Sequence, residues 1–130
     1  MIIGIGSDIT NISRISNTIK KHGDRFLNKC FDQTEINRSK NTINYKASLA
    51  KRFAAKEALS KALGTGFALG INWRDIVIKN DKRGKPFIEL KKNALKKLSQ
   101  IIPKNKNPII HLTISDESNI AYAMVIISCY

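Results

Sequence analysis

Hydrophobic positions along the chain follow two spacings, which predict strands at both ends and helices between them. Residues 1–6 form a short apolar run rich in isoleucine and predict a buried strand that ends at glycine. Residues 111–115 and 120–128 are two further apolar runs joined by a short polar turn, and they predict an antiparallel hairpin. A strand over residues 75–79 and another opened by Pro86 are expected on either side of a polar turn.

Apolar residues three and four positions apart predict the helices. The first predicted helix is capped by Asn11 or Ser13 and stopped by Gly23, and a short second one starts at Asp32 or Thr34 with its end left open. A long helix follows over residues 42–63, and a last one over residues 93–102 is stopped by Pro103. The long helix is rich in alanine, which allows neighbouring elements to approach it closely. No internal repeat or domain linker is visible. The chain is therefore predicted to be a single compact α+β domain over residues 1–130, with the long Ala-rich helix packed on an antiparallel sheet.

Length and composition limit the class of protein. At 130 residues, the chain can form one domain with a buried core. Its hydrophobic content of 42% argues against disorder, and its apolar runs are too short for a membrane span. The first apolar run lacks the flanking signals of a signal peptide, so a cytoplasmic protein is expected. Cys30 and Cys129 lack metal-site spacing and are predicted to be reduced structural thiols.

The net charge of +13 favours an anionic partner. One interpretation is a basic nucleic-acid-binding module without catalysis. The basic residues are scattered, however, and the chain has no aromatic ribonucleoprotein motif and no Cys/His finger, so no nucleic acid is expected. An acidic protein or a phosphate-rich small molecule would use the same field.

Two carboxylates occupy positions at which folding can bring them to one metal ion. Asp8 follows the first apolar run, at a predicted strand-to-helix junction, and Glu57 lies in the long helix. Mg²⁺ takes few protein carboxylates and fills its other positions with water and phosphate oxygens, so this pair suits a pyrophosphate-handling site. Taken alone, Asp8 is better explained by an interaction with a helix dipole. Residues 4–6 are not a dinucleotide loop, because Ile9 stands where the third glycine would be.

Glu57 and Lys61 are four positions apart, the spacing of an ordinary exposed helical salt bridge. The small residues around them favour the other interpretation, in which both side chains are buried and need partners. A metal ion and a phosphate group would supply those partners.

Five motifs follow one another along nearly the whole chain. They are G-I-G-x-D-I at residues 4–9, F-A-A-K-E-A-x-x-K-A-x-G-T-G at 53–66, W-x-D-I at 73–76, G-K-P at 84–86 and the closing pair of strands. In this order they resemble the holo-acyl-carrier-protein synthase family, the small phosphopantetheinyl transferases. One position departs from that resemblance, because the family usually shows Ser-His where this chain has Ser115-Asp116.

The resemblance implies transfer of 4'-phosphopantetheine from coenzyme A to a serine of apo-acyl carrier protein, giving holo-carrier and adenosine 3',5'-bisphosphate. It implies Mg²⁺ held by Asp8 and Glu57, and a catalytic set completed by Lys61 at the phosphates. The serine proton could pass to Glu57 or to a water at the metal ion, and the sequence leaves this open. Contacts to coenzyme A are implied for Arg52, Ser60, Lys61, Gly64, Arg83, Gly84, Lys85, Pro86 and Ser115. Arg52 and Ser60 are expected beside the cluster of Glu57 and Lys61, although either could equally be ordinary surface polarity. Residues 83–86 could likewise be an ordinary hairpin turn.

The resemblance also implies the partners. The acidic recognition helix of the carrier protein is expected to meet the first helix and the residues after it, namely Arg14, Lys21, Arg25 and Phe26. A homotrimer with active sites between subunits is implied. Asp116 cannot donate a hydrogen bond when ionised, so the phosphate contact of the family histidine is not transferred to it. It could hold a water at the metal ion or turn toward a neighbouring lysine, and a weakened member that only binds coenzyme A or the carrier is the alternative function.

Overall fold

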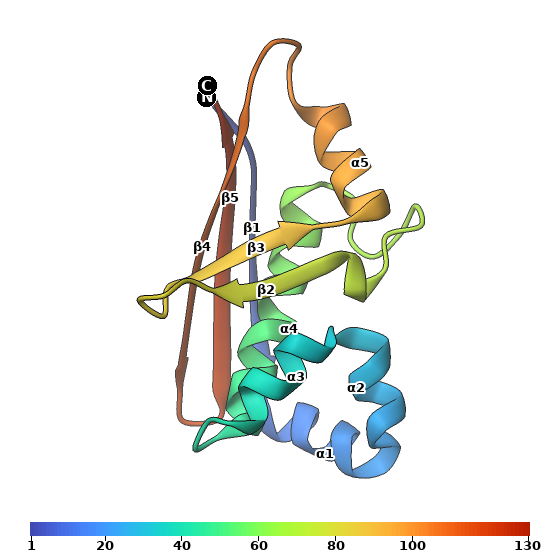
Figure 1. The fold of residues 1–130 in the computed structure, drawn as a ribbon, viewed down its shortest axis with the longest axis vertical. Coiled ribbons are helices and arrows are strands. Elements are labelled where there is room, and N and C mark those ends of the chain that lie inside the picture. Colours follow the sequence, from blue (N-terminus) through green and yellow to red (C-terminus); the bar gives the residue numbers. More distant parts are fainter.

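The computed structural model describes all 130 residues. The elements in chain order are β1 (Ile2–Asn11), α1 (Ile12–His22), α2 (Asp24–Cys30), α3 (Gln33–Lys40), α4 (Tyr45–Ala62), the 3₁₀ turn η1 (Trp73–Asp75), β2 (Ile76–Asn80), β3 (Pro86–Leu90), α5 (Lys92–Ile101), β4 (Pro108–Glu117) and β5 (Ile120–Cys129). Three antiparallel strands form one sheet in the order β1-β5-β4, while β2 and β3 form a separate hairpin. This sheet stands on one side of the molecule and the helices lie on the other (Figure 1). The α+β prediction is confirmed.

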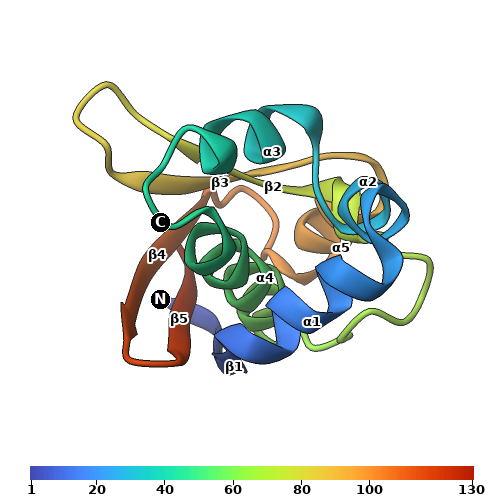
Figure 2. The same cartoon turned by 90° about the horizontal axis from the view of Figure 1, so that it is seen from below.

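The long helix α4 lies against the inner face of the three-stranded sheet, with α1 and α3 packed around it (Figure 2). Its first turn is capped by Asn44, whose side chain accepts a hydrogen bond from the Ala47 amide at 3.1 Å. No glycine or proline interrupts it, and Ala54 and Ala58 are fully buried. The predicted Ala-rich helix therefore exists, although it begins at Tyr45 instead of residue 42. No helix of the protein is long and apolar enough to cross a membrane.

Two hydrophobic clusters meet at α4. The larger lies between α4, the sheet, β2 and α5, and it contains Leu59, Ile76 and Val125. The smaller joins α1, α2 and α3 to the first half of α4 through Ile15, Phe31 and other buried side chains. Helix α4 therefore contributes residues to both clusters, and different faces of it pack against the sheet and against the other helices.

The strand β1 differs most from its prediction. It continues to Asn11, so Asp8 lies inside the strand and not at a strand-to-helix junction. The prediction of a buried strand is also wrong, because Ile5 and Ile9 are 59% and 68% exposed. These two side chains point to the outer face of the sheet, which no other part of the chain covers.

Smaller differences concern element boundaries. Gly23 stops α1 as predicted, but a second helix, α2, follows it immediately. The predicted strand at residue 75 starts at Ile76, because Trp73–Asp75 forms the 3₁₀ turn. The closing hairpin is longer than predicted, since β4 already begins at Pro108.

Candidate functional site

Two glycines allow β1 to lie directly on the backbone of α4. A Cβ atom at Gly4 would collide with the carbonyl oxygen of Ala62, and one at Gly6 with the carbonyl oxygen of Ala58. Only a residue without a side chain fits at these two positions. The G-I-G motif therefore brings Asp8, two residues after Gly6, next to the last turns of α4.

Asp8 points to the α4 side of the sheet and its side chain is only 15% exposed. Its Oδ2 atom accepts a hydrogen bond from the Thr10 hydroxyl at 2.7 Å. Its Oδ1 atom lies 3.2 Å from the Nζ atom of Lys61, which also donates to the Ser7 carbonyl at 2.9 Å. The carboxylate is thus held in place by groups from both β1 and α4.

Glu57 completes this acidic site from α4. Its pKa is raised above the ordinary value, first by burial and then by the nearby negative charge of Asp8. Lys61 and Arg14 oppose the rise through their positive charges. The structure thus brings Asp8, Glu57 and Lys61 together, as the sequence predicts.

The acidic site fits a Mg²⁺ ion. After burial, the negative charge of Asp8 is the next cause of the raised pKa of Glu57, and a cation between the two carboxylates would relieve this repulsion. No group of three His, Cys, Asp or Glu residues capable of holding a metal exists in the chain. A site with two carboxylates suits Mg²⁺, which keeps several positions for water and substrate phosphate, better than a metal that demands a full protein cage.

One expectation about burial is wrong. Lys61 is half exposed and Glu57 only partly buried, so they are not the deeply buried pair expected on α4. The pair that is fully buried is formed by the preceding residue, Lys56, with Glu35 of α3. Successive helical residues point about 100° apart, so Lys56 faces the helices while Glu57 faces β1.

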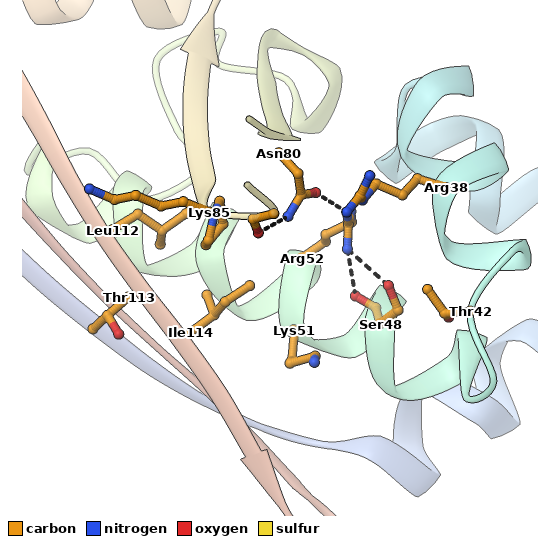
Figure 3. A pocket seen from close by; sticks show the side chains of 12 residues that line it. Arg38, Thr42, Ser48, Lys51, Arg52, Asn80, Lys85, Leu112, Thr113 and Ile114 are labelled. Carbon is orange, nitrogen blue, oxygen red and sulfur yellow. Dashed lines mark hydrogen bonds between the residues drawn. The ribbon is translucent and has the colours of Figure 1, made fainter. Parts of the chain in front are cut away.

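A second candidate site is a basic pocket of about 450 Å³ on the other side of α4. It lies between α3, α4, the β2–β3 turn and β4 (Figure 3). Its charged lining residues are Arg38, Lys51, Arg52 and Lys85, and no carboxylate lines it. Such a cavity has the charge and the hydrogen-bond donors to bind a phosphate group.

Arg52 is the most buried of these cations, at 4% exposed. Its guanidinium donates to the Ser48 hydroxyl at 2.9 Å and to the Asn80 side-chain oxygen at 2.8 Å, as the dashed lines in Figure 3 show. Its Nε atom has no hydrogen-bond partner, and no acidic residue pairs with it. Burial lowers the pKa of Arg52 from its ordinary value, yet an arginine remains charged, so the pocket keeps an uncompensated positive charge.

The β2–β3 turn forms one wall of the basic pocket. Asp81 Oδ1 accepts from the amides of Arg83 and Lys85, and Gly84 adopts a positive φ of 88° that favours glycine. Gly84, Lys85 and Pro86 line the pocket, in agreement with the predicted positions, whereas Arg83 belongs to the turn but does not line the pocket.

The remaining predicted contacts are dispersed. Ser60 is fully buried, and its hydroxyl donates to the Glu57 carbonyl at 2.7 Å, so it is neither surface polarity nor free to contact a ligand in this structure. Gly64, with a φ of 80°, lies exposed just beyond α4. Ser115 lies in β4, in a hollow beside the basic pocket. Arg52 lies in the basic pocket and not beside the acidic site, contrary to the expectation.

Several pocket residues were not predicted, namely Arg38, Thr42, Ser48, Lys51 and Asn80. Two local signals point to them. Ser48 is four residues before Arg52 on one helical face, and Asn80 directly precedes the turn. Arg38 carries no local signal, because only the packing of α3 on α4 brings it to the pocket.

The predicted docking residues occupy one end of the molecule. Arg14 and Lys21 lie on α1 and line a polar hollow of about 600 Å³. Arg25 and Phe26 lie in the separate helix α2, with Phe26 packed against Phe31 and Phe53. Arg14 lies near enough to the acidic site for its charge to lower the pKa of Glu57.

The two candidate sites lie at opposite edges of the three-stranded sheet. Asp8 belongs to β1 and Ser115 to β4, and β5 separates these two strands. Glu57 and Arg52 are five positions apart on α4, so they point to different sides of that helix. A single protomer therefore presents an acidic site at one edge and a basic pocket at the other.

The chain is similar to known proteins over almost its whole length. Residues 4–122 match the family model of the 4'-phosphopantetheinyl transferase superfamily. The chain is 50% identical over 127 residues to the holo-acyl-carrier-protein synthase of Rhizobium meliloti (strain 1021), covering 98% of this chain and 91% of that protein.

Solved structures give the same match. The holo-acyl-carrier-protein synthase of Neisseria meningitidis superposes with a TM-score of 0.84 at 36% identity, covering 98% of this chain and 99% of that one. The synthase of Helicobacter pylori, solved in complex with coenzyme A, gives a TM-score of 0.81 at 32% identity, with 95% and 99% covered.

Proposed function

The chain belongs to the 4'-phosphopantetheinyl transferase superfamily and transfers 4'-phosphopantetheine from coenzyme A to apo-acyl carrier protein, and we propose that Asp8, Glu57 and Lys61 form its catalytic site with Mg²⁺. One observation carries the proposal. The fold places Asp8, Glu57, whose pKa is raised by burial and by the charge of Asp8, and the half-exposed Lys61 together where β1 meets α4.

The reaction exchanges one oxygen–phosphorus bond for another. The serine Oγ bonds to the phosphorus that carries pantetheine, the bond from this phosphorus to the bridging oxygen breaks, and adenosine 3',5'-bisphosphate leaves. When bound by Asp8 and Glu57, Mg²⁺ would neutralise charge on the pyrophosphate and the leaving group.

Lys61 adds positive charge at the same place. In the free protein its ammonium is held by Asp8 and the Ser7 carbonyl, and its side chain is 50% exposed. A half-exposed lysine can turn from Asp8 toward a phosphate oxygen when substrate arrives. Glu57 or a water held at this site would accept the serine proton.

The basic pocket suits the nucleotide end of coenzyme A. Arg52 is buried, positively charged and without an acidic partner, so a phosphate group would satisfy it. Lys85 and the Gly84-Pro86 backbone lie on the same wall and can meet a nucleotide. Coenzyme A binding to both sites would join the pyrophosphate at the acidic site to the nucleotide in the basic pocket.

This requirement favours an active site shared between subunits. The two sites open at opposite edges of one sheet, with α4 and β5 between them. A neighbouring copy can bring its β4 edge to the β1 edge of the first, which places one acidic site beside one basic pocket. We therefore expect the functional form to be a cyclic homotrimer in which each interface holds one complete site.

The outer face of the sheet supports assembly. It presents Ile5 and Ile9 from β1 and Ile109 from β4, all large apolar residues that are 40–68% exposed in the isolated protomer. Several large apolar side chains exposed on one sheet face are typical of an interface between protein chains. Contact between copies would bury these isoleucine side chains, which are unusually exposed on the surface of a single protomer.

The docking end fits an acidic carrier protein. Arg14, Lys21 and Arg25 are exposed cations beside the half-buried ring of Phe26. Their field would orient an acidic helix of the carrier with its serine toward the acidic site, since Arg14 lies close enough to affect Glu57.

Mass spectrometry of apo-acyl carrier protein incubated with the chain, coenzyme A and Mg²⁺ tests the function. We expect the carrier to gain one phosphopantetheine, and Asp8→Asn or Glu57→Gln to abolish the gain while circular dichroism stays unchanged. Binding of coenzyme A without any gain would identify the chain as a weakened, binding-only member. Near-normal turnover in both variants would refute the metal site.

A further inference from the structure

Lys51 differs from the other cations of the basic pocket. Arg38, Arg52 and Lys85 form no ion pair, whereas the Nζ atom of Lys51 lies 2.9 Å from the Oδ1 atom of Asp116. The pair joins α4 to the end of β4, two elements that form facing walls of the pocket.

The two residues of this ion pair line different cavities. Lys51 lines the basic pocket, next to Arg52 on α4 (Figure 3), but Asp116 does not. Asp116 instead lines the neighbouring hollow together with Ser115 and Tyr122. The pair thus spans the border between the basic pocket, which Lys51 lines, and the neighbouring hollow, which Asp116 lines.

The stability of the fold does not account for this pair. The two side chains are 28% and 35% exposed, and a partly exposed ion pair adds little to stability. Its larger effect is on order, since a lysine side chain loses much rotamer freedom when it is fixed. Asp116 fixes the ammonium before any ligand arrives, and the ammonium, which has three N–H donors, retains donors for an anion in the pocket.

We infer that Lys51 is a further phosphate-binding residue of the basic pocket and that Asp116 positions it there. Arg52 would bind the phosphate from the α4 and β2 side and Lys51 from the β4 side. The inference rests on the proposed function in one respect, since it takes the nucleotide end of coenzyme A as the ligand. Asp116 touches no ligand and acts through Lys51.

Loss of Lys51 has two effects of the same sign. It removes one charge-assisted hydrogen bond to the phosphate, and it leaves the carboxylate of Asp116 without a counter-ion beside an anion. Loss of Asp116 has opposed effects, because Lys51 loses its position while a repulsive charge disappears. In the inferred arrangement the loss of order outweighs the loss of repulsion, because Asp116 does not line the basic pocket whereas Lys51 does.

Isothermal titration of adenosine 3',5'-bisphosphate without Mg²⁺ tests the role of Lys51 independently of catalysis. We expect Lys51→Met to weaken binding about tenfold, the scale of one charge-assisted hydrogen bond, and Lys51→Arg to retain most of it. Lys96→Met is the matched control, because it removes the same charge from α5, away from the pocket, and we expect it to change binding less than about twofold. Equal weakening by Lys51→Met and Lys96→Met would overturn the role of Lys51.

A double-variant cycle tests Asp116. We expect Asp116→Asn to weaken binding about threefold when Lys51 is present and to leave it unchanged or slightly tighter in the Lys51→Met background. Tighter binding by the same factor in both backgrounds would make Asp116 a repulsive charge only. Tighter binding only with Lys51 present would make Asp116 a competitor for Lys51, and either result would overturn the positioning role.

The carrier assay separates this inference from the proposed function. A wild-type chain that modifies the carrier and binds the bisphosphate, with Lys51→Met unaffected, refutes the inference alone. A wild-type chain that does neither refutes the proposed function and the inference with it.

Discussion

The Nζ atom of Lys56 lies 2.8 Å from the Oε1 atom of Glu35, and both side chains are fully buried. The same ammonium donates to the carbonyls of Cys30 and Trp73, at 2.6 and 3.1 Å, and lies 5.1 Å from the centre of the Phe31 ring. Glu35 also accepts from the Ile78 amide at 3.1 Å. One buried pair thus joins α2, α3, α4 and β2, and it fixes the rotation of α4 one residue before Glu57.

Lys56→Met is expected to destabilise the protein by about 3–5 kcal/mol, because it leaves the Glu35 carboxylate buried without a counter-ion. Urea unfolding followed by circular dichroism measures the change. Lys46→Met, on the same helix but in no ion pair, is the control and should lie within about 0.5 kcal/mol of wild type. A loss below about 1 kcal/mol in Lys56→Met would contradict the pair's structural role.

Glu57→Gln is expected to stabilise the metal-free protein at neutral pH. The folded protein raises the pKa of Glu57, so just above the ordinary pKa of glutamate it binds a proton that the unfolded chain has lost. The contribution of Glu57 to stability is therefore present at low pH and is lost as pH rises through its folded pKa. Glutamine cannot ionise and keeps that contribution.

Thermal unfolding over a pH series, with and without Mg²⁺, measures this effect. Mg²⁺ should raise the Tm of the wild type, because it binds the folded state, and should leave Glu57→Gln and Asp8→Asn nearly unchanged. An equal Mg²⁺ shift in all three proteins would place the ion elsewhere.

Gly6→Ala is expected to separate β1 from α4. The added Cβ would overlap the backbone carbonyl of Ala58, and neither backbone can move without disturbing the core. We expect a loss of about 1–3 kcal/mol in stability, the scale of an overpacked core, together with loss of transfer activity as Asp8 moves away from Glu57. Ser7→Ala, on the outward-facing side of the same strand, is the control and should change neither. Wild-type activity in Gly6→Ala would show that the close contact is dispensable.

The sequence predicts the acidic site because its determinants are local. Two glycines, a following aspartate and an Ala-rich helix are sufficient to bring Asp8 to Glu57 and Lys61, and each of these features is visible in a short motif. Of the two alternatives that the sequence leaves open for Asp116, a water at the metal ion or a neighbouring lysine, the structure shows the second, with Lys51 as the partner.

Features that depend on pairing between distant elements could not be predicted. Glu35 and Lys56 are 21 residues apart, and their burial depends on how α3 packs on α4. Arg52 is predicted from the sequence to lie beside the Glu57 cluster, yet the helical rotation over five residues separates the two side chains. An apolar strand usually predicts burial within the same protomer, yet Ile5 and Ile9 are exposed. In the proposed trimer, the surface that would cover them belongs to another subunit.

Charge reversal at Arg25, at the docking end, should affect the use of the carrier protein alone. Arg25→Glu is expected to raise the KM for the carrier severalfold and to leave that for coenzyme A unchanged, because Arg25 lies on α2, away from the basic pocket. Rising salt should produce the same effect in the wild type. Arg14→Glu should also lower kcat, because the positive charge of Arg14 lowers the pKa of Glu57 and its reversal leaves less of this carboxylate ionised. Lys97→Glu on α5 is the matched control, and an equal rise in both KM values for Arg25→Glu would exclude a separate docking end.

Mixing two inactive variants tests whether the active site is shared between subunits. Glu57→Gln disables the acidic site and Arg52→Met the basic pocket, and in a single protomer these lie at opposite edges of the sheet. If one subunit supplies the acidic site and its neighbour the basic pocket, random mixed trimers contain interfaces at which both halves are intact. Equal amounts should then recover about one quarter of wild-type activity, because each half is intact with a probability of about one half.

The mixture needs subunit exchange, which is obtained by co-expression or by dilution and reconcentration, and light scattering confirms the trimer. Mixing Glu57→Gln with Asp8→Asn is the control, because both variants damage the acidic site and no interface can be complete. Ile5→Asp on the outer face of the sheet should abolish both the trimer and the activity, because a buried charge there would oppose assembly. Absence of recovery in mixed trimers of Glu57→Gln and Arg52→Met would mean that each protomer uses its own two sites, and it would remove the reason for an interfacial active site.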